Sequence, residues 1–184
     1  MINFTKAIKV SGFSLKSTQP MYEHQSWTGK VLQRGTGIQY YEAEFTLTYN
    51  ISDRHEVDQF LALHSLGKPF QMDLGHLSTY TGTQTAAVTS TTAKAAGSAT
   101  INTSTQSLRV GDRIQFTNHT KIYSIIDRTN TSVTIFPALR QSVATGEIIK
   151  YSNITITGIL KAENTYVCPV TNVTTQKLTV WENL

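Results

Sequence analysis

The clearest pattern along the chain is a strict alternation of hydrophobic and polar residues in "GIQYYEAEFTLTYN", residues 37–50. One set of alternate positions is hydrophobic and comprises Tyr41, Ala43, Phe45, Leu47 and Tyr49. The positions between them are Tyr40, Glu42, Glu44, Thr46 and Thr48. Successive side chains of a strand point to opposite faces, so this pattern predicts an antiparallel strand with one buried face.

A helical pattern follows the strand and predicts a helix over about Asp53–Leu66. Its hydrophobic stripe has helical spacing and consists of Val57, Phe60, Leu61 and His64. Asp53 and Glu56 have the spacing of a capping box. Gly67 provides a left-handed stop, and Pro69 prevents the helix from continuing. No other segment has a comparable pattern, so we expect this to be the main helix.

The remaining strands predicted for the two ends of the chain are shorter or less regular. "NFTKAIKV" (3–10) predicts a first strand that ends at Ser11-Gly12, and "STQPMYEHQSW" (17–27) predicts a loop. "KVLQRGTG" (30–37) predicts the start of a strand and then a turn at its glycines. Further strands are expected at "PFQMDL" (69–74), "NITITGIL" (153–160) and "QKLTVWE" (176–182).

The middle of the chain differs from the two ends in amino-acid composition. Residues 75–103 are rich in Thr, Ala, Ser and Gly, which indicates a linker or short strands. Four short strands separated by turn signals follow, in "LRVGDRIQF", "KIYSII", "SVTIFPAL" and "GEIIKY". Their regular spacing predicts a small barrel or sandwich. We therefore predict a β-rich domain formed by residues 1–82 and 152–184, interrupted by a module at 83–151, since insertions succeed at exposed loop tips.

Composition supports a β-rich globular chain without a nucleic-acid footprint. Hydrophobic residues make up 39% of the 184 residues, enough for a core, while charged residues are only 15%, below the typical ~25%. The net charge is +4, but Lys and Arg are scattered rather than clustered, so we interpret them as an ordinary surface. Cys168 is the single cysteine, which excludes an intrachain disulfide and a cysteine-based metal site. It is expected in a strand as a small hydrophobic residue.

Candidate catalytic groups are few, and none forms a persuasive set. His55 and His64 would lie near opposite faces of the helix and could not share a metal. His64 is interpreted as a packing residue, and His119 as a solvated turn residue. The carboxylate pair Glu42 and Glu44 could do acid–base work, but the polar face of a strand is the better interpretation. We predict no catalytic residue, no cofactor, no metal and no enzyme.

Several motifs in the middle and at the end of the chain resemble the distal tail proteins of long-tailed siphophages. Within 95–151 these are Gly111-Asp112-Arg113-Ile114, Lys121-Ile122-Tyr123, Pro137-Ala138-Leu139 and Gly146-Glu147. The order of strand, helix, short strand and Gly/Thr-rich link, and the terminal "LTVWENL", are similar as well. The resemblance implies a mainly β fold: a β-sandwich with one α-helix that carries an inserted OB-like β-barrel. It also implies a ring, usually a hexamer, that joins the tail tube to the hub and the receptor-binding fibres.

A barrel of this kind could also bind a ligand, because OB folds bind oligosaccharides and oligonucleotides. Tyr123 is the one candidate stacking residue, and its role is left open, whereas Phe116 and Phe136 are expected in the core. No binding residue is assigned. A host-surface glycan is the favoured ligand if the module binds anything, and no specific nucleic acid is expected.

The leading hypothesis is a structural virion protein that forms the distal tail ring. The resemblance implies a location at the tail tip. Assembly in the host cytoplasm is expected, because "MINFTKAIKV" lacks a signal-peptide core and no stretch is long enough to cross a bilayer. A tube or tail-completion protein is the alternative within the same particle. It would need a long strand-rich loop, which the sequence does not reveal. A binding module that acts alone on sugar or single-stranded nucleic acid is the alternative from another class.

Overall fold

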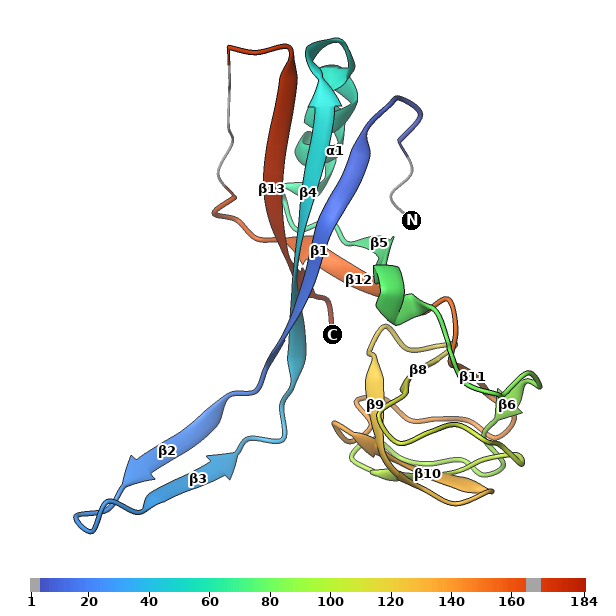
Figure 1. Cartoon of the computed structure of the whole chain (residues 1–184). Helices are drawn as coiled ribbons and strands as arrows, with labels where there is room; N and C mark the ends of the chain where they lie inside the picture. The colour runs from blue at the N-terminus through green and yellow to red at the C-terminus, as the bar shows by residue number, and fades with distance from the viewer. Residues whose placement is uncertain (1–3, 165–169) are drawn as a thin grey trace.

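The structure is a computed structural model that describes residues 4–164 and 170–184. The chain is mainly β, as predicted, and the described part contains one α-helix. Figure 1 shows three parts: a long twisted sheet with the helix beside it, a hairpin that projects from the end of this sheet, and a small barrel. Cys168 lies outside the described residues, so its predicted place in a strand stays a prediction. No helix in the two described ranges is long and apolar enough to span a bilayer.

The long sheet has five antiparallel strands in the order β1-β4-β13-β12-β5. Their bounds are β1 Lys9–Thr18, β4 Tyr40–Asn50, β13 Val173–Glu182, β12 Thr155–Leu160 and β5 Phe70–Asp73. Strand β13, from the C-terminal end of the chain, lies between β4 and β12. The N-terminal and C-terminal segments therefore share one sheet, with residues of the barrel between them in sequence.

The alternation in β4 sets the buried face of this sheet. Tyr41, Ala43, Phe45, Leu47 and Tyr49 are all buried, as predicted, and the residues between them are half-buried. Strand β13 continues the same face with Leu178 and Val180. This apolar layer packs against Val57 and Leu61 of the helix, so burial on one side only explains the period of two.

The helix α1 spans Arg54–His64, within the predicted range, and a 3₁₀ turn at Ile51–Asp53 precedes it. The predicted capping box is wrong, because Asp53 makes no side-chain cap bond. The carboxylate of Glu56 instead accepts hydrogen bonds from the Thr5 and Lys6 backbone N–H groups, at 2.6 and 3.0 Å. These bonds, that from Thr5 first, hold the pKa of Glu56 below its ordinary value. Glu56 thus ties the N-terminal segment to the helix.

The first strand begins later than predicted and does not end at Ser11-Gly12. Strand β1 runs through this dipeptide, and its pairing with β4 shifts register between Ser11 and Ser14. Gly12 has a φ of +62°, which a residue with a side chain rarely adopts. The glycine therefore marks a β-bulge rather than a strand end.

The predicted loop at 17–27 is also wrong, because it contains a strand. Strands β2 (Met21–Gln25) and β3 (Val31–Gly35) pair as an antiparallel hairpin of their own. Their pairing passes through Tyr22–Arg34, Glu23–Gln33 and His24–Leu32. Mixed polarity concealed β2, because a strand exposed on both faces shows no alternation.

The barrel is a six-stranded sheet with the order β6-β11-β8-β9-β10-β7. Its strands are β6 Val88–Thr89, β7 Thr100–Asn102, β8 Arg113–Phe116, β9 Tyr123–Arg128, β10 Ser132–Phe136 and β11 Ile148–Lys150. A bridge between Ser90 and Thr103 joins the regions that follow the two end strands, β6 and β7. The sheet therefore closes on itself, which removes its free edges.

The barrel has its own hydrophobic core, formed by residues of all six strands and separate from that of the long sheet. Phe116 is fully buried in it, as predicted. The core assignment of Phe136 is wrong, since this side chain is 37% exposed. The alternation of β10 buries Val133 and Ile135, and Phe136 follows them on the opposite face.

Gly158 of β12 is expected to tolerate no side chain. A Cβ at this position would overlap the side chain of Val180 on the neighbouring strand. Gly158→Ala should lower the free energy of unfolding by about 1–3 kcal/mol, because overpacking forces neighbours out of their rotamers. Gly35→Ala is the matched control, since its Cβ would have no heavy atom nearer than 4.0 Å. Equal urea midpoints for the two variants would contradict this account of β12.

Candidate assembly interface

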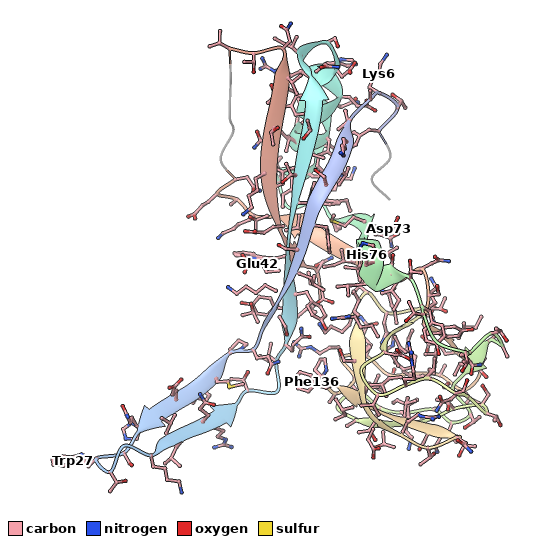
Figure 2. All side chains as sticks on the ribbon, viewed as in Figure 1. Lys6, Trp27, Glu42, Asp73, His76 and Phe136 are labelled. Atoms are coloured by element: carbon pink, nitrogen blue, oxygen red, sulfur yellow. The ribbon has the colours of Figure 1, made fainter. Side chains whose placement is uncertain are left out.

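The hairpin of β2 and β3, with its turn at residues 26–30, is called the arm below. Its turn is well ordered by hydrogen bonds: the Ser26 N–H donates to the Lys30 carbonyl and the Gly29 N–H to the Ser26 carbonyl, both at 2.9 Å. Gly29 has a φ of +80°, which allows this tight reversal. Trp27 occupies the tip, and Figure 2 shows its side chain at the end of the arm farthest from the sheet.

Every residue of both arm strands is exposed. Tyr22 is 72% exposed, and Trp27 is fully exposed. The other large hydrophobic side chains that the arm leaves in solvent are Met21, Val31 and Leu32. Cross-strand pairing places Tyr22 and Leu32 on one face and Met21 and Val31 on the other, so both faces of the arm carry apolar surface.

A hairpin of two strands is at best marginally stable in water on its own. At the base of the arm, Thr36 donates from its backbone N–H and its hydroxyl to the Pro20 carbonyl, at 3.3 and 2.8 Å. Exposed apolar side chains on both faces, with an aromatic tip, are typical of a segment that another chain covers. The arm is therefore the candidate assembly interface of this protein.

Glu42 and Glu44 lie on the polar face of β4, as predicted, and are half-buried. Each is paired with a lysine of a neighbouring strand: Lys16 lies 3.8 Å from Glu42, and Lys177 lies 2.7 Å from Glu44. The four residues are cross-strand charge pairs on an open sheet surface. Each carboxylate therefore has a lysine partner on a neighbouring strand.

The barrel is joined to the long sheet by a buried cluster around Glu182, which we call the junction. The Lys121 ammonium donates to the Glu182 carboxylate at 2.6 Å, and the two side chains are 2% and 0% exposed. The same carboxylate accepts from the backbone N–H groups of Tyr41, at 2.9 Å, and Ile122, at 3.2 Å. One acidic side chain of β13 thus holds β4 and the β8–β9 loop of the barrel together.

Two further contacts strengthen the junction. The Lys121 ammonium lies 4.7 Å from the centre of the Tyr41 ring, a favourable cation–π distance. Gln115 of β8 donates to the Thr155 carbonyl at 3.0 Å and to the Thr120 carbonyl at 3.1 Å. Burial lowers the pKa of Lys121, and Glu182 opposes this shift. The barrel is therefore anchored to the long sheet by hydrogen bonds that water cannot easily replace.

The connection between β8 and β9 is more than the polar turn that the sequence predicted. His119 was expected in solvent but is buried: its Nδ1 lies 3.2 Å from the Tyr123 hydroxyl, and its Nε2 lies 3.4 Å from the Ser142 carbonyl. Ile122 packs into the core of the long sheet, whereas Tyr123 packs into the core of the barrel. Successive side chains of this segment do point to opposite sides, but one side is covered by the long sheet and the other by the barrel core.

Tyr123, the candidate stacking residue whose role the sequence left open, is fully buried and cannot bind a ligand on the surface. Its hydroxyl accepts from the Arg140 backbone N–H at 3.1 Å. His64 is a packing residue, as interpreted: it is buried against Phe60 and Phe70, with ring centres 4.8 and 5.0 Å away. Among the described residues, His, Cys, Asp and Glu form no group of three or more that could hold a metal ion.

Tyr123 should give the protein a specific sensitivity to alkaline pH. Burial raises the pKa of its hydroxyl above the ordinary value of 10.0. Between the two pKa values the unfolded chain loses this proton and the folded chain keeps it, so stability falls as pH rises above 10. Tyr123→Phe should cost about 1–3 kcal/mol at neutral pH, because it leaves the Arg140 N–H without its acceptor. The difference from wild type should shrink above pH 10.

Urea unfolding at several pH values between about 7 and 11 measures this effect. Tyr22→Phe is the control, since Tyr22 is exposed and the change removes no buried hydroxyl. A Tyr123→Phe difference that stays constant over the whole range would contradict the role assigned to the buried hydroxyl.

Sequence reasoning missed strand β2 of the arm and also missed the junction. Strand β2 shows no alternation because both of its faces are exposed. Glu182 did carry a signal, because the alternation of β13 places it on the same face as Leu178 and Val180. An acidic residue in a core-facing position implies a buried partner. Lys121 carried no such signal, since it lies in a loop and resembles any surface lysine.

Comparisons with known proteins add no family to this description. No protein-family model matches the chain, and no curated protein matches it either.

Proposed function

We propose that this protein is a structural virion protein, a ring subunit at the distal end of a phage tail. In this role it would join the tail tube to the hub and to the receptor-binding apparatus. The observation that carries the proposal is the arm, which extends ordered apolar side chains away from the rest of the chain (Figures 1 and 2). The resemblance of the barrel motifs to distal tail proteins supports the same role.

The arm favours a closed ring for a geometric reason. Its surface differs from the body of the long sheet, so an arm that docks on the next subunit without a reciprocal exchange makes a heterologous contact. Such contacts repeat around an axis and form a ring when the rotation closes. Strand β1 is an edge of the long sheet, so its outer backbone groups are free to pair with the next subunit. A ring of six is the expected stoichiometry.

The barrel suits a place on the outside of such a ring. It lies on one side of the long sheet and away from the arm (Figure 1). The buried junction holds it in a fixed orientation rather than on a flexible tether. The role proposed is mechanical and needs neither catalysis nor a cofactor. The proposed location is the tail tip of the virion, after assembly in the host cytoplasm.

A tube or tail-completion protein is a second candidate, and the arm also favours it. The sequence showed no long strand-rich extension, and the arm is one. In a tube, extensions of this kind would contact the next ring along the axis and produce an open polymer. The two candidates therefore differ in how the assembly ends.

Light scattering coupled to size-exclusion chromatography, followed by negative-stain electron microscopy, tests the proposal on the full chain. A distal ring subunit should give discrete closed rings whose mass does not grow with concentration. Stacked tubes of growing length would favour the second candidate. A monomer at all concentrations, and also in the presence of the tube and hub proteins, would contradict both.

A further inference from the structure

A small pocket lies where the link from the long sheet enters the barrel. It has a volume of about 190 Å³, which is smaller than a site for a drug-sized molecule and suits a single small cyclic unit. Its walls come from the 3₁₀ turn at Gly75–Ser78, the following link, and the start of β8. Figure 2 labels His76 on this turn, above the barrel. Tyr80, Asp112, Arg113 and Tyr151 are among the residues that line it.

Two tyrosine rings form one wall of the pocket. Tyr80 and Tyr151 pack edge to face, with centres 4.9 Å apart and planes at 71°. The Tyr151 hydroxyl donates to the Ala86 carbonyl at 3.0 Å, and a Cβ at Gly82 would overlap the Tyr80 ring. Both rings are therefore held in place before any ligand arrives, which lowers the entropic cost of binding.

Two of the charged groups around the pocket, Arg109 and Asp112, are partners of each other. The Arg109 guanidinium lies 5.8 Å from the Tyr80 ring centre and donates to the Thr81 hydroxyl at 3.0 Å. It also lies 3.5 Å from the Asp112 carboxylate, which accepts from the Arg109 backbone N–H at 2.7 Å. Asp112 is thus neutralised within its own turn.

Arg113 is the free group. Its side chain lines the pocket, and its Nε is buried without a hydrogen-bond partner in the described part of the chain. None of the ion pairs among the described residues includes it. A buried donor without a partner is unfavourable, and a guanidinium binds a carboxylate through two parallel hydrogen bonds. The pocket therefore offers a fixed aromatic wall beside an unpaired cation.

We propose that this pocket binds an acidic saccharide, with one sugar ring against the tyrosines and its carboxylate on Arg113. The apolar C–H face of a sugar ring suits an aromatic wall, and its hydroxyls suit the polar lining residues His76, Thr79 and Thr81. A strand of stacked bases suits the site less well. The two rings meet edge to face and offer no row of parallel faces on which successive bases could stack.

The proposal concerns a ligand of the single chain and does not depend on the ring. Titration calorimetry and ¹H–¹⁵N NMR of the full chain with digalacturonic acid would test it, with the neutral dimer galactobiose as the matched ligand. Digalacturonic acid should bind and shift the amides of residues 76–82 and 109–113. Galactobiose should bind at least about tenfold more weakly, because it lacks the charge-assisted pair with Arg113.

Two variants locate the site. Arg113→Gln should weaken binding of the acidic dimer about tenfold or more and leave galactobiose unchanged. Arg128→Gln removes an exposed arginine elsewhere on the barrel and should change neither ligand. Thermal melts of both variants check that the fold is kept.

Three results would overturn the proposal. The first is no binding of digalacturonic acid at millimolar concentration. The second is binding that Arg113→Gln leaves unchanged. The third is full competition by inorganic sulfate with the same dependence on Arg113, which would make the pocket a plain anion site without a sugar subsite.

Discussion

Glu182→Gln is expected to lower the free energy of unfolding by about 3–5 kcal/mol, the largest single effect that we predict for the described residues. The variant keeps the size and shape of the side chain but leaves the Lys121 ammonium buried without its counter-ion. Lys121 is 2% exposed, so water cannot compensate for the lost charge. The glutamine carbonyl can still accept one of the two backbone N–H groups that the carboxylate accepted.

Urea unfolding measures this loss, and hydrogen exchange locates it. Exchange should accelerate first at the Ile122 and Tyr41 amides, which donate to Glu182, because the barrel loses its anchor before either core unfolds. The matched control is Glu44→Gln, which removes a glutamate from the ion pair with Lys177 on the exposed side of the same sheet. That change should cost no more than about 1 kcal/mol.

A double variant separates the buried charge from the shape of the site. Lys121→Met in the Glu182→Gln background removes the stranded ammonium and should restore part of the stability, since a buried ion pair can often be replaced by neutral groups. If Glu182→Gln were no more harmful than Glu44→Gln, the junction would not hold the barrel as described.

The second large effect is expected on assembly rather than on stability. Replacing residues 20–38 by a short Asn-Gly turn should abolish ring formation while the melting temperature of the subunit changes little. Thr18 and Tyr40 are opposite each other in the ladder of β1 and β4, so a short turn can join the shortened strands without strain. Every residue of the arm strands is exposed and none belongs to either core cluster, so their loss should not disturb either core.

Point variants refine the test of the arm. Trp27→Ser at the tip should weaken assembly strongly, because exposed aromatic residues are the usual anchors of interfaces. Phe136→Ser is the control: it removes another partly exposed aromatic residue, on the barrel, and should leave assembly unchanged. Rings that persist without the arm would show that subunits meet through other surfaces, and the proposed interface would be wrong.

The success of the sequence predictions followed the environment of each segment. Strand β4 and helix α1 were predicted well because each has one face on a core and one in water, which imposes a clear period. Strand β2 of the arm was missed because both of its faces are exposed, so its residues follow no period. The strand start predicted in residues 30–37 is confirmed by β3. His119 was misplaced, and the role of Tyr123 was left open, because their segment is covered on two sides, by the barrel core and by the long sheet.

For Glu182 and Arg113, the local sequence pattern predicted the face or the motif to which the residue belongs, but not the residues that surround it. The alternation of β13 placed Glu182 on the buried face, but nothing in the sequence identified Lys121, 61 residues away, as its partner. Arg113 belongs to a turn motif noted from the sequence, yet its lack of a partner depends on where Tyr80 and Tyr151 come to lie. Pairing over such separations is decided by packing, which no local pattern records.

The sequence alone therefore determined the class of fold, the main helix and the faces of the regular strands, because burial on one side imposes a period. Only the tertiary structure decided that the barrel closes, that Glu182 anchors it, and that residues 21–35 project as an ordered arm. These features arise from contacts between residues far apart in the chain, or from the absence of any such contact. Neither leaves a periodic signature in the sequence.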